Sequence, residues 1–193
     1  MQEGLWALPT SELLSRTSSS EPTPGGGSIA AITGALGVGL VQMALAVTAD
    51  PELGPLSGRL DAIRERIVPG ADADVADFEN LMAAYRAPRS TDTEREERRR
   101  LIEAATVAAT ERPLELVAAL IDALVASHDA ESAVKPGIVS DVIAGRDIVV
   151  GAAWAAIRTV DVNIAQLDRS SSVRAPELRA TRDELAHRLQ EAS

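Results

Sequence analysis

The stretch that decides the fold runs from Glu21 to Asp50 and reads EPTPGGGSIAAITGALGVGLVQMALAVTAD. Three consecutive glycines precede a segment, Ser28 to Ala49, that has no charged residue and consists mainly of small and aliphatic side chains. Each glycine inside a helix costs roughly 1 kcal/mol of helix propensity relative to alanine, and close contact with neighbouring helices can offset that cost. We therefore predict an uncharged, Gly/Ala-rich helix over 28–48 at the centre of a bundle, contacted on most sides.

The same segment is long enough to cross a bilayer, which takes roughly 20 apolar residues. Its flanks, Glu21 and the run Asp50-Pro51-Glu52, carry no basic cluster, whereas membrane spans are usually flanked by lysine and arginine. We therefore expect a buried helix and no membrane partner. The N-terminus lacks a basic region followed by an apolar core, so the expected location is cytoplasmic.

The composition narrows the classes of protein to consider. A chain of 193 residues is expected to form one domain, over 1–193, with a sizeable core. The net charge of −10 argues against nucleic acid as a partner, because proteins that bind its phosphates normally carry a basic face. The absence of cysteine excludes disulfides, thiol nucleophiles and cysteine–zinc sites. His128 and His187 lie on different predicted helices, so we expect no metal site.

Helical spacing of apolar residues recurs along the rest of the chain. The sequence therefore predicts an all-α, single-domain bundle of about six to seven helices. Thr91, with Glu94 three residues on, forms a capping box, and Pro113 should kink or split the helix behind it. The helix over 140–167 is unusually apolar and is the second candidate for the bundle centre. The other expected helices cover 5–17, capped by Thr10 or Ser11, then 53–67, 71–85 and 176–191.

The glycine run at the start of the central helix is a candidate binding site. Consecutive free N–H groups at a helix start attract anions, and glycines remove the side chains that would block approach. The candidate residues are Pro24, Gly25, Gly26, Gly27 and Ser28. The alternative is a tight turn between helices, although one glycine usually suffices for a turn. The segment lacks the lysine of a phosphate-binding loop.

Asp74 and Phe78 are four residues apart and so share one face of a predicted helix. An acidic residue beside an aromatic ring could present a carboxylate to a ring-bearing substrate. The alternative is an acid near the helix start, where the dipole favours it, together with a phenylalanine of the core. Asp72 and Asp77 are expected to face solvent.

Polar residues of the second apolar helix form another group of candidates. At about 100° per residue, Asp141 and Asn163 return to nearly the same face, although Asp141 beside Ser140 could simply belong to the helix cap. Asp161 and Asn163 lie in an apolar stretch. Because buried polar groups need partners, these two side chains either bond to a neighbouring helix or line a ligand cleft.

Three cations lie near predicted helix ends or in loops: Arg86, Arg89 and Lys135. Any of them could meet a carboxylate tail of a ligand. The alternative for each is a solvated surface charge.

In these stretches the chain resembles the cyclodeaminase/cyclohydrolase family of tetrahydrofolate enzymes. Three segments match in order: PTPGGGSIAAITGALGVGLVQMALAVT (22–48), DVADFENLMAAYRAPR (74–89) and VSDVIAGRDIVVGAAWAAIRTVDVNI (139–164). The chain departs from the family pattern at 135–138, where an Asn-rich turn is usual. It also departs at Asp161, where the family usually has Asn, and at Arg89, where Lys is common.

The resemblance implies an all-helical homodimer with a folate cleft near the glycine-rich segment. It makes Asp74 the candidate acid/base and Asp141 a second candidate catalytic residue. The substrate-binding candidates are Pro24, Gly25, Gly26, Gly27, Ser28, Phe78, Arg89, Lys135, Ser140 and Asn163. No cofactor is expected beyond the tetrahydrofolate substrate.

Two reactions and one non-catalytic role follow from the resemblance. A stand-alone chain favours methenyltetrahydrofolate cyclohydrolase, which hydrolyses 5,10-methenyl- to 10-formyltetrahydrofolate. The alternative is formiminotetrahydrofolate cyclodeaminase, which forms the methenyl bridge and releases ammonia. The second alternative is a non-catalytic helical dimer that binds a folate-like ligand or a protein partner.

Overall fold

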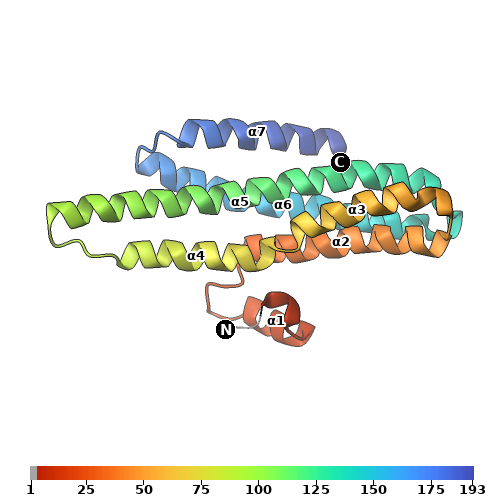
Figure 1. The fold of residues 1–193 in the computed structure, drawn as a ribbon, viewed down its shortest axis with the longest axis horizontal. Helices are drawn as coiled ribbons and strands as arrows, with labels where there is room; N and C mark the ends of the chain where they lie inside the picture. Colours follow the sequence, from red (N-terminus) through yellow and green to blue (C-terminus); the bar gives the residue numbers. More distant parts are fainter. Residues whose placement is uncertain (1–3) are drawn as a thin grey trace.

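The computed structural model describes residues 4–193, and this part of the chain forms an elongated bundle of α-helices (Figure 1). The predicted all-α architecture is confirmed. The helices are α1 (Thr10–Thr17), α2 (Gly26–Thr48), α3 (Gly54–Ile67), α4 (Gly70–Arg86), α5 (Asp92–Ala133), α6 (Val139–Arg169) and α7 (Ala175–Ala192). Short 3-10 turns η1 (Leu5–Ala7), η2 (Pro51–Leu53) and η3 (Pro136–Ile138) precede α1, α3 and α6.

The two predicted central helices, α2 and α6, pack against each other along their length in opposite directions. They meet at backbone distance where Gly37 faces Gly145. A Cβ added to Gly37 would lie 2.7 Å from the carbonyl oxygen of Gly145, and one added to Gly145 would lie 2.6 Å from that of Gly37. Glycine is required at both positions by this close approach, which was expected for the glycines of the central helix and not for Gly145.

Both α2 and the segment Pro136–Arg169 are long and apolar enough to cross a membrane by length and composition alone. In the bundle, 56% of the most apolar window of α2 and 39% of that of the second segment are buried. Packing against α3, α4, α5 and α6 accounts for much of the apolar surface of α2. Leu36, Met43 and Val47 of α2 remain exposed.

Of the two outcomes predicted for Pro113, a kink or a split, the split was wrong. α5 continues from Asp92 to Ala133 with Pro113 inside it. Proline has no N–H to give to the carbonyl of residue i−4, which here is Ala109. The Asn163 side chain supplies the missing donor from α6, with Nδ2 2.7 Å from the Ala109 oxygen.

The predicted capping box at the start of α5 is confirmed. The Glu94 N–H donates to Thr91 Oγ1 at 3.1 Å, and the Thr91 N–H donates to the Glu94 carboxylate at 3.0 Å. Hydrogen bonds from the Thr91 and Ser90 N–H groups lower the pKa of the Glu94 carboxyl. The sequence pattern found this helix start because every group in the motif is local.

The other predicted caps were wrong. α1 begins at Thr10 behind Pro9, and no side chain caps it, so the helix expected over 5–17 is divided into η1 and α1. Pro9 cannot continue the helical hydrogen bonding from the preceding turn. α6 begins at Val139 directly behind η3. Ser140 therefore lies inside the first turn of α6, where it cannot act as the cap.

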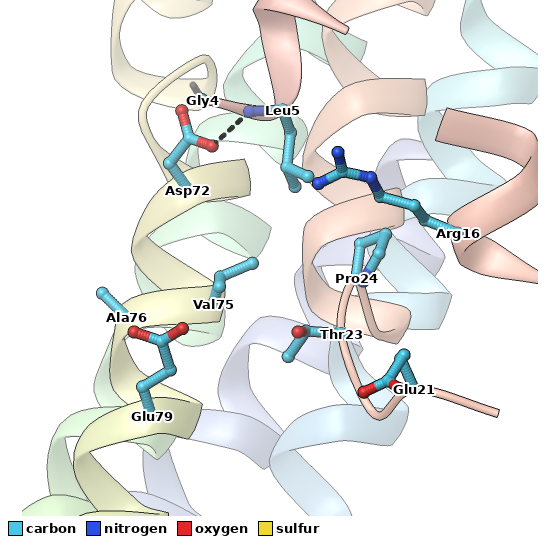
Figure 2. Close-up of a pocket in the computed structure, with 10 residues that line it drawn as sticks. All are labelled: Gly4, Leu5, Arg16, Glu21, Thr23, Pro24, Asp72, Val75, Ala76 and Glu79. Carbon is cyan, nitrogen blue, oxygen red and sulfur yellow. Dashed lines mark hydrogen bonds between the residues drawn. The ribbon is translucent and has the colours of Figure 1, made fainter. Parts of the chain in front are cut away.

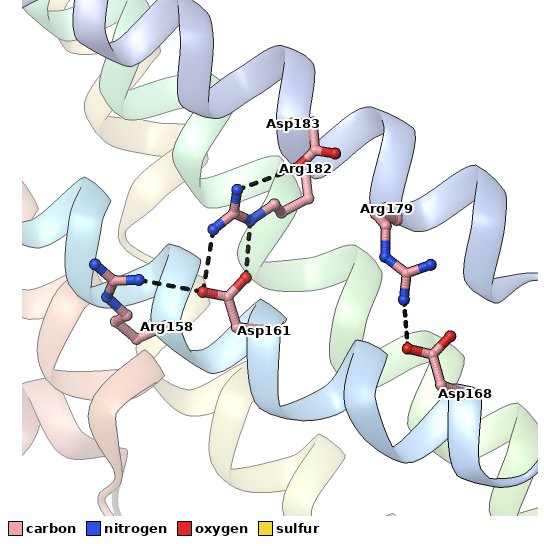
Figure 3. Close-up of polar contacts among 6 residues, drawn as sticks. All are labelled: Arg158, Asp161, Asp168, Arg179, Arg182 and Asp183. Atoms are coloured by element: carbon pink, nitrogen blue, oxygen red, sulfur yellow. Dashed lines mark hydrogen bonds and ion pairs between the residues drawn. The ribbon is translucent and has the colours of Figure 1, made fainter.

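The outermost elements are α1, which buries no residue and lies beside the α2–α4 junction, and α7, which lies on α5 and α6 (Figure 1). Asp161 holds α7 in place. Its carboxylate accepts from Arg182 Nε at 2.7 Å and from Arg182 Nη2 at 3.2 Å (Figure 3). The hydrogen bond to Asp161 raises the pKa of Arg182. Of the two options for Asp161, the structure shows a bond to a neighbouring helix.

Candidate functional site

The start of α2 is capped by a carboxylate from another helix. Asp74 of α4 accepts two hydrogen bonds at Oδ2, from the Ser28 N–H at 2.9 Å and from the Ser28 hydroxyl at 2.8 Å. Ser28 is completely buried. A negative charge is favourable at a helix N-terminus, and the paired bonds fix the orientation of the carboxylate. Asp74 therefore lies at the glycine run with Oδ2 occupied by Ser28.

Gly27 leaves the space in which this carboxylate sits. A Cβ added to Gly27 would lie 2.2 Å from Asp74 Oδ1, whereas one added to Gly26 would have only ordinary contact, 3.6 Å from Thr159 Oγ1. No glycine in residues 4–193 has a positive φ. Contact at Gly27, and not an unusual backbone angle, is therefore what requires a glycine in this run.

The occupied helix start changes what the glycine run can bind. An external anion at this place would be repelled by Asp74, and the Ser28 N–H is already used. The exposed Gly26 still allows a ligand to approach the α2 backbone closely. The geometry therefore favours a neutral or cationic group beside Asp74 over the anion considered from sequence.

A cavity of about 190 Å³ opens next to Asp74, between the start of α2 and helices α4, α5 and α6. It brings together six of the predicted site residues from three distant segments. Thr159 also lines it and was missed, because a threonine within an apolar helix has no distinctive sequence signal. The lining residues are Pro22, Thr23, Gly25, Gly26, Gly27, Asp74, Phe78, Leu81, Ala109, Thr159 and Asn163.

Thr159 differs from several other helical threonines in what its hydroxyl does. Thr33, Thr48, Thr106 and Thr110 each donate to the carbonyl four residues earlier. Within residues 4–193 the Thr159 hydroxyl makes no such bond, so it is available to a ligand. Together with Asp74 and Asn163 it gives the cavity polar groups, and Phe78 and Leu81 supply an apolar wall.

Asp77, expected to face solvent, is instead 9% exposed and pairs with Arg112 of α5. Arg112 Nε lies 2.7 Å from Asp77 Oδ2, and this hydrogen bond raises the pKa of Arg112. Arg112 and Pro113 also border a small gap beside Asp74. The pair joins α4 to α5 one helical turn from the Asp74 carboxylate and so helps to hold its helix in place.

Of the remaining predicted site residues, Ser28 is buried and bonded to Asp74, and Pro24 lines a neighbouring hollow. The other four lie away from the cavity. The Lys135 N–H donates to Thr48 Oγ1 at 3.1 Å, and Lys135 Nζ donates to the Val47 carbonyl at 3.3 Å, at the opposite end of α2. Ser140 and Asp141 follow directly in α6. Asp141 and Thr159 are 18 positions apart in one helix, about 27 Å along its axis.

Arg89 is exposed in the loop between α4 and α5 and does not line the cavity. Asp141 and Asn163 share a helix face as predicted, but lie about 33 Å apart along it, at 1.5 Å per residue. The ligand roles of Arg89, Lys135, Ser140 and Asp141 stay predictions.

A larger hollow of about 720 Å³ lies on the other side of the Thr23–Pro24 segment (Figure 2). Asp72 there accepts a hydrogen bond from the Leu5 N–H at 2.6 Å and so ties η1 to α4. The carboxylates of Glu21 and Glu79 also border it, and its arginine, Arg16, is paired with Glu12 at 2.8 Å. The smaller cavity is the better site, because its polar groups are oriented and less exposed.

The fold and cavity define an all-helical protein with one oriented carboxylate beside a small cavity. The sequence profile described as Formiminotransferase-cyclodeaminase matches residues 9–182, so the chain belongs to this family. Two other proteins are similar to this chain over most of its length. A methenyltetrahydrofolate cyclohydrolase from Methylorubrum extorquens is 30% identical over 154 residues, which are 76% of this chain and 72% of that protein.

The second is a crystal structure of formiminotetrahydrofolate cyclodeaminase from Thermotoga maritima. It superimposes with a TM-score of 0.71 over 97% of this chain and 96% of that chain, at 19% sequence identity. At this identity the likeness shows the shared fold.

Proposed function

We propose that the chain acts on the one-carbon bridge between N5 and N10 of tetrahydrofolate, as a methenyltetrahydrofolate cyclohydrolase. The observation that carries the proposal is the Asp74 carboxylate. Ser28 holds it through Oδ2, and Asp74 borders a cavity that Phe78 and Leu81 make partly apolar. The family and the cyclohydrolase relative supply the substrate class.

The charge of the site suits the substrate of this reaction. The methenyl bridge of 5,10-methenyltetrahydrofolate is a cation shared between N5, the bridging carbon and N10. A carboxylate a few ångströms from such a cation is attractive, and more so where water is partly excluded. A cationic substrate is also consistent with the Asp74 carboxylate at the start of α2, a place where the sequence had suggested a site for an anion.

The reaction is a hydrolysis in which Asp74 moves protons. Asp74 takes a proton from a water molecule as the water oxygen bonds to the methenyl carbon, which gives a neutral tetrahedral carbon. The C–N5 bond then breaks, its electron pair stays on N5, and N5 receives a proton. The hydroxyl on carbon loses its proton and becomes the carbonyl of 10-formyltetrahydrofolate. A positioned general acid/base contributes about 10²–10⁴-fold to such a step.

The cyclodeaminase reaction is the second candidate, favoured by the fold shared with the Thermotoga maritima enzyme. In that reaction N10 attacks the formimino carbon, loses a proton, and ammonia leaves with one. The same carboxylate can carry that proton. The absorbance of the methenyl chromophore separates the two reactions.

A purified sample is given 5,10-methenyltetrahydrofolate or 5-formiminotetrahydrofolate in separate assays. Loss of the methenyl chromophore faster than in buffer supports the hydrolase. Its appearance from the formimino compound, with ammonia, supports the deaminase. Absence of both rates would refute an enzyme and favour the non-catalytic dimer.

Assembly as a cytoplasmic homodimer belongs to the same proposal. An apolar strip is formed by exposed side chains at helical spacing on α2 and on α6. On α2 they are Leu36 (58% exposed), Met43 (36%) and Val47 (52%), and on α6 they are Ile148 (39%) and Val162 (67%). An exposed apolar strip on core helices is typical of a protein interface. A second copy placed antiparallel on this strip brings the Asp141 end of one copy toward the Asp74 end of the other.

A further inference from the structure

The bond between Asn163 and Ala109 exists because of Pro113. In a regular α-helix the N–H of residue 113 would donate to the carbonyl of residue 109, but proline has none. Pro113 is buried, and Ala109 borders the ligand cavity. An unpaired carbonyl there would be costly. The Asn163 amide nitrogen donates to it at 2.7 Å from a different helix.

This bond fixes which way the Asn163 amide points. A carbonyl oxygen can pair only with the NH₂ end of an asparagine, since the Oδ1 end would repel it. The other end of the amide, Oδ1, is therefore turned away from Ala109. In the described part of the chain, every buried side-chain oxygen or nitrogen has a hydrogen-bond partner, whereas Asn163 Oδ1 has none. Asn163 Oδ1 is therefore not among the buried atoms. Oδ1 is thus accessible, and Asn163 is a cavity-lining residue.

We infer that Pro113 and Asn163 together give the cavity a fixed hydrogen-bond acceptor, Asn163 Oδ1, which selects ligands that place an N–H group against α6. This rests on the proposed function, in which the occupant is a reduced pterin, a ring that carries several N–H donors along one edge. An asparagine with a free amide could turn over and accept or donate. Here Pro113 leaves the Ala109 carbonyl for the Asn163 amide nitrogen, so only one orientation of the amide is favourable. Pro113 is in this sense a positioning residue.

The test uses a cycle of three variants and a stable folate, 5-formyltetrahydrofolate, as the probe. Asn163→Ala removes both the donor to Ala109 and the acceptor. Pro113→Ala restores a backbone N–H that can bond to Ala109. In the double variant the backbone N–H restored at position 113 can donate to the Ala109 carbonyl, while position 163 carries no amide. Gln166→Ala is the matched control, because it removes an amide from the same helix outside the cavity. Melting temperature and the dissociation constant of the probe are measured for each.

Asn163→Ala is expected to lower the melting temperature by about 2–6 °C and to weaken probe binding by about 10-fold. In the double variant the melting temperature should return to near that of Pro113→Ala, while binding stays about 10-fold weaker than in Pro113→Ala. Gln166→Ala should bind the probe as the wild type does.

Recovery of binding together with stability in the double variant would show that Asn163 only caps Ala109, and the inference would be overturned while the proposed function stood. Equal binding by wild type and Asn163→Ala would overturn it in the same way. If the wild type neither binds the probe nor turns over methenyltetrahydrofolate, the proposed function fails and the inference with it.

Discussion

The two ends of the α2–α6 pair use polar groups in different ways. At the Gly26 end, Asp74 is bonded through one oxygen only and Thr159 makes no internal side-chain bond within residues 4–193. At the Thr48 end, polar groups pair with one another: Thr48 bonds to the Ala44 carbonyl and accepts from the Lys135 N–H. Ala49, with φ of 55°, closes the helix there through an N–H bond to Leu45. The Gly26 end therefore keeps oriented polar groups with free hydrogen-bonding positions, whereas the polar groups at the Thr48 end pair with one another.

The largest expected effect is at the Asp74 carboxylate. Asp74→Asn keeps an oxygen that can accept the bonds from Ser28, so folding should be intact, with a melting temperature within about 2 °C of wild type. The neutral amide cannot accept the proton, and methenyltetrahydrofolate turnover should fall by about 10²–10⁴-fold. Turnover close to wild type would move the acid/base role away from Asp74.

A methyl group at Gly27 tests whether the carboxylate must sit where the glycine lets it. The Cβ of Gly27→Ala would lie 2.2 Å from Asp74 Oδ1, so the carboxylate has to move. A misplacement of about 1 Å can cost on the order of 10²-fold in rate. Gly26→Ala is the control, because its Cβ meets only Thr159 at 3.6 Å. Equal rates for the two variants would show that the glycines serve only the turn.

Mixing two variants tests whether Asp141, at the Thr48 end of the α2–α6 pair, takes part in catalysis. If the proposed dimer completes each site with the Asp141 end of the other copy, Asp141→Asn should lower turnover by about 10-fold or more. Co-refolding it with Asp74→Asn should then restore activity, because each mixed dimer has one site with both aspartates. Wild-type rates for Asp141→Asn alone would show that this end has no part in catalysis.

The exposed strip provides the corresponding test of assembly. Met43→Glu places a charge on the strip, away from the cavity, and should convert dimers to monomers in light scattering. Burying an unpaired charge in an apolar interface is strongly unfavourable. Val173→Glu, at an 87% exposed position outside the strip, is the control. A monomeric wild type would contradict the proposed homodimer.

The smallest expected effect concerns the capping box far from both ends. The folded-state pKa of Glu94 is lowered by N–H donors, so its contribution to stability is present above its ordinary pKa of 4.5. That contribution is lost as the pH falls through the lowered value. Glu94→Gln should therefore flatten the acid side of a plot of stability against pH. Parallel curves for wild type and variant would show that the cap carries no charge-linked stability.

Local patterns in the sequence were enough for most of the fold. The Thr91–Glu94 box, the apolar periodicity and the uncharged stretch after the glycine run each depend on residues within a few turns. The cap predictions at Thr10 or Ser11 and at Ser140 failed locally, at Pro9 and at the turn η3.

Two other predictions failed because the partner lies far away in sequence. α5 continues through Pro113 with Asn163 bonded to the Ala109 carbonyl across 54 positions. Asp77 is buried because Arg112 pairs with it across 35 positions.

The glycine run shows the same division within one site. The sequence determined that α2 is a small-residue core helix, and the resemblance grouped Gly25–Gly27, Asp74 and Asn163, which the structure brings together around one cavity. Only the tertiary structure decided that Asp74 reaches across 46 positions to occupy the helix start, that Thr159 stands beside it, and that Asp141 lies at the other end. The physical reason is that helix formation is governed by neighbours in sequence, whereas the orientation of a polar side chain depends on the partner that packing brings to it.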